Sequence, residues 1–83
     1  MIEAKIKALI ESYIVDNGYI LDDVLYVYED NNYYLRIVID KKGLIDISDC
    51  IKVTKIIDPL IEDANYIKDS YILDVCSKEK GCE

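Results

Sequence analysis

The chain has 83 residues and a mass of 9.6 kDa, which is room for one domain with one hydrophobic core. Seventeen acidic against ten basic residues give a net charge of −7, so the chain repels a phosphate backbone and a basic protein is its more natural partner. No apolar run approaches the ~20 residues that span a bilayer, and the N-terminal residues, with Glu3 among them, do not resemble a signal peptide.

Residues 2–17 are predicted to form an amphipathic helix. Its apolar residues recur at helical spacing and make one stripe of Ile2, Ile6, Leu9, Ile10, Tyr13 and Ile14. Asn17 and Gly18 are expected to end the helix, because glycine adopts the left-handed conformation after a helix terminus without steric cost.

Residues 19–29 and 33–40 are rich in β-branched and aromatic types, and the polar residues between them tolerate turn geometry, which predicts a β-hairpin. Pairing Tyr28 with Tyr33 sets the register. The better apolar face then points to the core and comprises Val24, Tyr26, Leu35 and Ile37. The opposite face is mixed and is expected to point away from the helices, and it comprises Asp23, Leu25, Val27, Tyr34, Arg36 and Val38.

A second helix is predicted to begin at Asp46, after a turn at residues 41–43. Asp46 is a good N-cap, and Asp49 three residues later completes the pattern of a capping box. The apolar stripe of this helix comprises Ile47, Cys50, Val53, Ile57 and Leu60. Pro59 has no amide hydrogen, so we expect it to kink or end the helix near Ile57.

After a polar loop at residues 62–70, a third strand is predicted at residues 71–75, with Leu73 and Val75 facing the core. The element order is therefore α-β-β-α-β. Two amphipathic helices on one face of a three-stranded sheet make a two-layer α+β sandwich. The domain is expected to span residues 1–77, and residues 78–83 are expected to be a flexible tail.

The sequence contains no recognisable catalytic machinery. Cys50, Cys76 and Cys82 are an odd number at irregular spacing, which favours reduced thiols over a disulfide framework. Asp49 beside Cys50 resembles an acid with a nucleophile, but the chain has no histidine to act as base, so Cys50 is interpreted as a small core residue. We therefore predict no enzyme activity, no metal site and no cofactor.

Four short sequence motifs follow one another along the chain, at the predicted strands and at the start of the second helix. They are Gly18-Tyr19-x-Leu21 with Val24-x-Tyr26, Tyr34-Leu35-Arg36-Ile37-x-Ile39-Asp40, Gly43-x-Ile45-x-Ile47-x-Asp49-Cys50, and Tyr71-x-Leu73-Asp74-Val75-x-Ser77. Together they resemble the N-terminal domain of the bacterial ribosome maturation factor family RimP, over residues 2–77. The chain departs from the family pattern at Leu44, where a second glycine is common, and at Tyr66, where proline is common.

The resemblance implies a non-catalytic, cytoplasmic domain that assists maturation of the small (30S) ribosomal subunit. It also implies a fold similar in outline to a KH domain, and a separate C-terminal β-barrel domain. The sequence ends at Glu83 without that barrel, so a fragment and a natural short form both stay open. The chain lacks the GXXG loop with which KH domains clamp RNA, so we expect docking mainly to protein, a basic ribosomal protein in particular.

The outer sheet face is the candidate contact surface, because soluble monomers seldom expose an apolar patch without a use. A small basic turn beside it offers a minor contact with ribosomal RNA. The predicted contact residues are Leu25, Val27, Tyr34, Arg36, Val38, Lys41 and Lys42.

Several alternatives stay open for the same face. The chain is alternatively a stand-alone interaction module that forms a homodimer through the outer face. In a second alternative, the C-terminal barrel covers this face. In a third, the face is an exposed apolar surface without a binding function. None of these alternatives involves a membrane.

Overall fold

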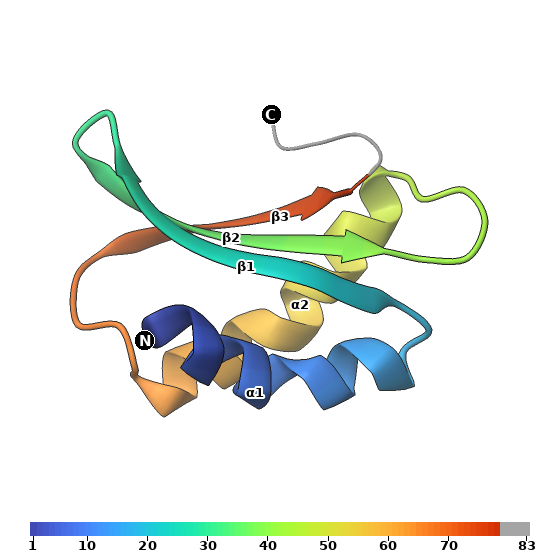
Figure 1. The fold of residues 1–83 in the computed structure, drawn as a ribbon, viewed down its shortest axis with the longest axis horizontal. Coiled ribbons are helices and arrows are strands. Elements are labelled where there is room, and N and C mark those ends of the chain that lie inside the picture. The colour runs from blue at the N-terminus through green and yellow to red at the C-terminus, as the bar shows by residue number, and fades with distance from the viewer. Residues whose placement is uncertain (79–83) are drawn as a thin grey trace.

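The structure is a computed structural model, and it describes residues 1–78. The helices and strands follow the order α1 (Ile2–Asp16), β1 (Ile20–Glu29), β2 (Asn32–Asp40), α2 (Ile47–Ala64) and β3 (Tyr71–Ser77) (Figure 1). This confirms the predicted order α-β-β-α-β. The flexible tail expected from residue 78 lies outside the described residues except for Lys78, whose backbone N–H donates a 2.8 Å hydrogen bond to the carbonyl of Ile39.

The three strands form one mixed sheet in the order β1-β2-β3. β1 and β2 are antiparallel, whereas β3 runs parallel to β2 and is reached through α2. Both helices lie on the same side of the sheet, with α1 against β1 and α2 against β3 (Figure 1). The predicted two-layer α+β fold is therefore confirmed, and within residues 1–78 neither helix covers the other face of the sheet.

The hairpin has the predicted register. Tyr28 pairs with Tyr33 and Val24 pairs with Ile37. Its two-residue turn has positive φ angles at Asp30 (50°) and Asn31 (66°), which is the geometry of a type I′ turn. That turn fits the twist of the two strands, and it fixes which side chains point to each face.

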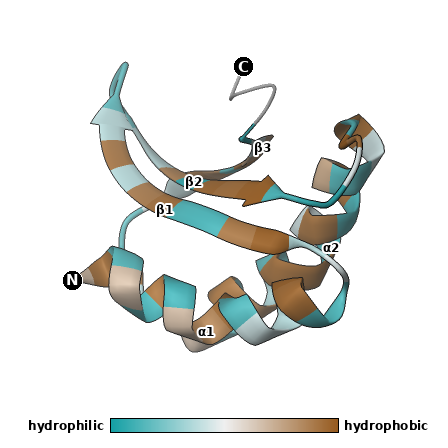
Figure 2. Cartoon of the chain, turned by 45° about the vertical axis from the view of Figure 1, so that its right-hand side comes forward, coloured by the Kyte–Doolittle hydropathy of each residue, from teal (hydrophilic) through white to brown (hydrophobic). Residues whose placement is uncertain are grey.

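The hydrophobic core lies between the sheet and the two helices, where apolar residues of the two layers face each other (Figure 2). Its fully or almost fully buried side chains come from α1, β2, α2 and the loop before α2, and they are Ile6, Ile10, Ile14, Leu35, Ile37, Ile39, Ile45, Val53, Ile57 and Ile61. Three residues of the predicted stripes lie outside this core. Tyr13 is 46% exposed at the edge of the α1 stripe, Ile47 is 77% exposed at the start of α2, and Leu60 is half-buried beside Pro59.

Pro59 was predicted to kink or end the second helix near Ile57, and the second of these outcomes was wrong. α2 continues to Ala64, so residues 62–64 are helical rather than part of a loop. Pro59 is exposed, while Ile57 and Ile61 on either side of it are buried against the sheet. The burial of Ile61 offsets the single backbone hydrogen bond that proline cannot make.

The third strand runs to Ser77, two residues beyond the predicted end, and Cys76 and Ser77 are buried. Cys76 is disulfide-bonded, which corrects the expectation of reduced thiols at this position. Within residues 1–78, neither helix is long and apolar enough to cross a bilayer.

Candidate protein-binding surface

The sheet face opposite the helices carries a strip of apolar side chains. The register places Val27 and Ile72 on either side of Tyr34, from β1 and β3 respectively. Leu25 and Ile72 are 39% and 44% exposed, and the other members are half-buried. We call this set the outer strip, and it comprises Leu25, Val27, Tyr34, Val38 and Ile72.

Arg36 lies within the outer strip and links all three strands. Its guanidinium makes a bidentate contact with the carboxylate of Glu29 on β1, at 2.7 and 3.3 Å. Its Nε lies 3.6 Å from a carboxylate oxygen of Asp74 on β3, and the guanidinium carbon lies 5.1 Å from the centre of the Tyr34 ring. The charge of Arg36 is therefore balanced within the face and does not offer an unpaired cation to a partner.

These contacts shift the ionisation of both groups in the direction expected for an ion pair. The hydrogen bond from Arg36 lowers the pKa of Glu29, and the hydrogen bond to Glu29 raises the pKa of Arg36. Both groups are charged at neutral pH, and the salt bridge is partly exposed to solvent.

The two predicted lysines have different surroundings. The ammonium of Lys41 lies 3.0 Å from the carboxylate of Asp49 at the start of α2, so this lysine serves an internal ion pair. Lys42 is exposed and makes no ion pair with another described residue. Of the two, only Lys42 offers its charge fully to a partner.

The sequence interpretation did not identify three residues of this surface. Ile72 and Asp74 lie on β3, whose parallel register depends on the crossover through α2 rather than on a turn. Glu29 is the last residue of β1, as predicted, but its contact with Arg36 was not foreseen. Side chains along a strand point alternately to its two faces. Because Leu73 and Val75 were predicted to face the core, the sequence already indicated that Ile72 and Asp74 face outward.

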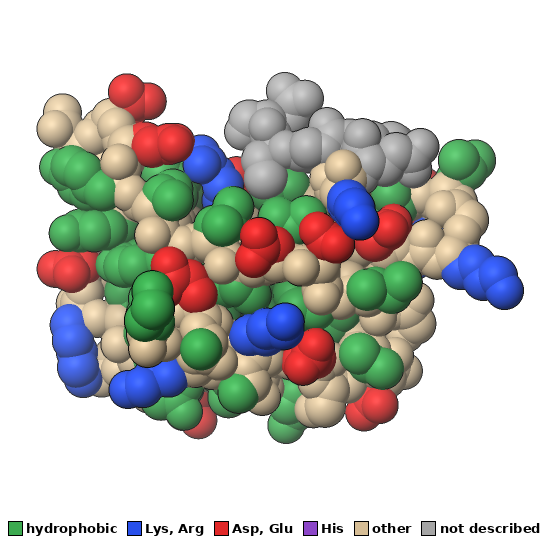
Figure 3. All heavy atoms as spheres, viewed as in Figure 1, with side chains coloured by type: hydrophobic (Ala, Val, Ile, Leu, Met, Phe, Trp, Pro, Cys, Tyr) green, Lys and Arg blue, Asp and Glu red, His purple; other side chains and the backbone are tan. Residues whose placement is uncertain are grey.

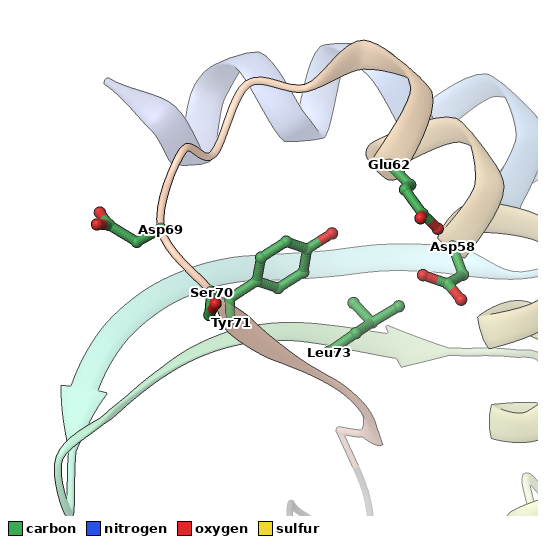
Figure 4. Close-up of a pocket in the computed structure, with 6 residues that line it drawn as sticks. All are labelled: Asp58, Glu62, Asp69, Ser70, Tyr71 and Leu73. Carbon is green, nitrogen blue, oxygen red and sulfur yellow. The ribbon is translucent and has the colours of Figure 1, made fainter.

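A groove lies along β3, on the helix side of the sheet, with a volume of about 480 Å³. Asp58 and Glu62 come from one side of α2, Asp69 comes from the loop before β3, and Tyr71 and Leu73 form the floor (Figure 4). Burial, followed by the charges of Asp58 and Glu62, raises the pKa of Tyr71. No group of three metal-binding side chains within residues 1–78 is placed to hold a metal ion.

Tyrosines gather where the groove reaches the hairpin end of the sheet. Tyr33 stacks on Tyr26 at 5.2 Å between ring centres and contacts Tyr28 at 4.8 Å. Burial, followed by the charge of Asp69, raises the pKa of Tyr26. Figure 3 shows hydrophobic side chains gathered at this end, with charged side chains of both signs among them and over the remainder of that view.

The family model described as RimP N-terminal domain matches residues 9–78. The chain belongs to the RimP N-terminal domain family. RimP proteins are ribosome maturation factors, so the family carries a role in ribosome maturation. The matched RimP segment contains every predicted contact residue, from Leu25 to Lys42, and all residues of the groove along β3.

Proposed function

We propose that this RimP-type domain is non-catalytic and assists maturation of the small (30S) ribosomal subunit in the bacterial cytoplasm. It docks mainly onto a basic ribosomal protein, through the outer strip. The observation that carries this proposal is the apolar strip on a sheet face without a helix, in a chain of the RimP family.

The composition of the face supports contact with protein rather than with RNA. Tyrosine and arginine beside aliphatic side chains are typical of the centre of a protein interface. Arg36 is already paired with Glu29 and Asp74, and the net charge of −7 disfavours a phosphate backbone. Ribosomal RNA then contributes at most a minor contact, for which Lys42 is the exposed cation.

The alternative is a stand-alone interaction module that forms a homodimer through the same strip. A C-terminal barrel domain is a further candidate to cover it. A dimer would bring two copies of charge −7 together, whereas a basic ribosomal protein would balance that charge. Charge therefore favours the ribosomal partner.

The test is co-sedimentation of the chain with purified small subunits, at low salt and near physiological salt. In the test variant, Val27→Lys is combined with Tyr34→Glu. These two positions face each other across β1 and β2, so the new charges attract each other and the hairpin is retained, while the net charge stays the same. We expect this variant to lose binding at both salt concentrations.

The matched control combines Val15→Lys with Tyr13→Glu. It makes the same chemical changes at two exposed positions of α1 and should bind like the unmodified chain. Equal binding by the test variant and the control would overturn docking through the outer strip. A dimer of the unmodified chain in light scattering, without small-subunit binding, would support the alternative.

A further inference from the structure

β3 has a free edge. Within residues 1–78 it pairs with β2 on one side only. Proteins usually protect such an edge with lysine, proline or a bulge, because its unpaired N–H and C=O groups can bind another strand. β3 has the sequence Tyr-Ile-Leu-Asp-Val-Cys-Ser, and its single charge, Asp74, is used by Arg36. Over Tyr71–Val75, the part of the edge beside the groove, the described residues therefore supply none of the usual protection.

The groove runs beside this edge and is acidic. Asp58, Glu62 and Asp69 line it, and none of the ion pairs among the described residues involves these three carboxylates. The close-up in Figure 4 shows Asp58 and Glu62 on neighbouring turns of α2, on the same side of β3 as the ring of Tyr71. A strand added at the edge would present half of its side chains to these carboxylates.

The groove also offers aromatic surface. Tyr71 forms its floor and pairs with Tyr33 on β2, which stacks on Tyr26. The faces of tyrosine rings attract lysine and arginine side chains. Carboxylates and aromatic rings in one groove therefore favour the same kind of side chain.

We propose that β3 accepts an extended basic segment of a partner protein as a fourth strand. The lysine or arginine side chains of this segment lie in the groove, near Asp58, Glu62 and Asp69. Its alternate side chains lie on the other sheet face beside Ile72, which is 44% exposed, and are therefore apolar. The favoured segment alternates basic and apolar residues.

The negative charge of the groove disfavours two other occupants of this edge, a second copy of the chain and a nucleic acid. A second copy of the chain paired through β3 would place two sets of these carboxylates close together. Single-stranded nucleic acid would bring phosphates to the same carboxylates. This edge meets the outer strip only at Ile72, and its use does not depend on binding to the ribosome.

The first test uses a synthetic peptide of alternating lysine and valine, titrated into the isotope-labelled full chain. We expect backbone amide signals of β3 to shift, and the amides on its free edge to exchange more slowly with solvent. A second peptide has the same sequence but is N-methylated on the amides that would face β3. It keeps the charge but cannot pair as a strand, so we expect its binding to be lost. Equal binding of both peptides would overturn the strand-addition proposal.

The second test removes two carboxylates of the groove by combining Asp58→Asn with Glu62→Gln. Exposed ion pairs are individually weak, so we expect the lysine–valine peptide to bind roughly three- to tenfold more weakly. The matched control combines Asp16→Asn with Glu11→Gln on the exposed surface of α1, and should leave affinity unchanged. An equal loss in both variants would show general electrostatic attraction and overturn the groove. Slower exchange at β3 on concentrating the chain alone would indicate self-pairing and overturn the basic partner.

Discussion

The phenolic hydroxyl of Tyr19 donates a 2.6 Å hydrogen bond to the carboxylate of Asp49, thirty positions further along the chain. Asp49 also accepts from the backbone N–H of Asp46 at 2.9 Å, and its other contact is the ammonium of Lys41 at 3.0 Å. One carboxylate thus joins the α1–β1 connection, the end of β2 and the first turn of α2. Tyr19 and Asp49 both belong to the motifs in which this chain resembles RimP, and their role here is to fix the orientation of α2.

Replacing Tyr19 with phenylalanine removes this hydrogen bond and keeps the buried ring. We expect Tyr19→Phe to lower the free energy of unfolding by about 1.5–3 kcal/mol, the net value of a hydrogen bond to a charged group. Urea denaturation measures the change. The control is Tyr13→Phe, whose ring is 46% exposed, and which should leave stability unchanged. Equal effects of the two substitutions would show that the bond has no stabilising role.

Acid should weaken the domain through Asp49. The hydrogen bond from Tyr19, with those from Asp46 and Lys41, holds the pKa of Asp49 well below its usual range. A carboxyl whose pKa is lower in the folded state stabilises the fold above its unfolded pKa of about 4, and this contribution is lost as the pH falls further. Stability measured from pH 6 downward should therefore fall below about pH 4, and Asp49→Asn should fall less steeply. The same dependence of stability on pH in the unmodified chain and in Asp49→Asn would contradict this role of Asp49.

The fold should also lose stability at high pH, through the ionisation of Tyr19. The hydrogen bond to Asp49, followed by burial, raises the pKa of Tyr19 to about 12. A group whose pKa is raised on folding contributes stability below its unfolded pKa, about 10 for tyrosine, and this contribution is lost as the pH rises to about 12. The pKa values of Tyr26 and Tyr71 are also raised, so the ultraviolet absorbance of phenolate should show several tyrosines titrating later than exposed ones. Tyr19→Phe should remove the step near pH 12.

Ile57 should be among the most sensitive positions of the core. Its side chain is fully buried between α2 and the sheet, so Ile57→Ala leaves a cavity that costs about 2–5 kcal/mol. A domain of this size has little stability to spare, and we expect the variant to be largely unfolded at 37 °C. Ile51→Ala on the same helix is the control, because Ile51 is 51% exposed and its loss should cost under about 0.5 kcal/mol. Circular dichroism during heating distinguishes the two variants.

Pro59→Ala should stabilise the protein. Alanine supplies the missing N–H to the carbonyl of Lys55 and has the highest helix propensity, while proline partly offsets this by restricting the unfolded chain. We expect a net gain of about 1 kcal/mol or more in the free energy of unfolding, measured in urea. A loss of stability would mean that the proline ring contributes packing that its exposure does not indicate.

The sequence predicted best where the structure depends on local patterns. Asp30 and Asn31 accept left-handed geometry, and the strands beside them alternate clearly, so the register of the hairpin was correct residue by residue. Asp46 and Asp49 form the expected capping box for the same reason, since each contact lies within one helical turn.

The sequence predicted poorly where distant packing decides. The helix passes Pro59 because Ile61 is buried against the sheet, and local propensity does not include that burial. Ile72 and Asp74 join the outer face because β3 pairs with β2 in a parallel register that no turn specifies. The acidic groove likewise brings together α2 and a later loop, and no spacing of carboxylates in the sequence indicated it.

The mixed sheet also sets an order of assembly. β1 and β2 are neighbours in sequence and close through a two-residue turn, so their pairing is available within microseconds of folding. β3 is connected to β2 through α2, so we expect it to be the last strand to join the sheet and the first to detach. When the native state unfolds locally, β3 should detach while the β1–β2 hairpin stays paired. The edge of β2 that β3 leaves could then pair with another strand in a parallel orientation.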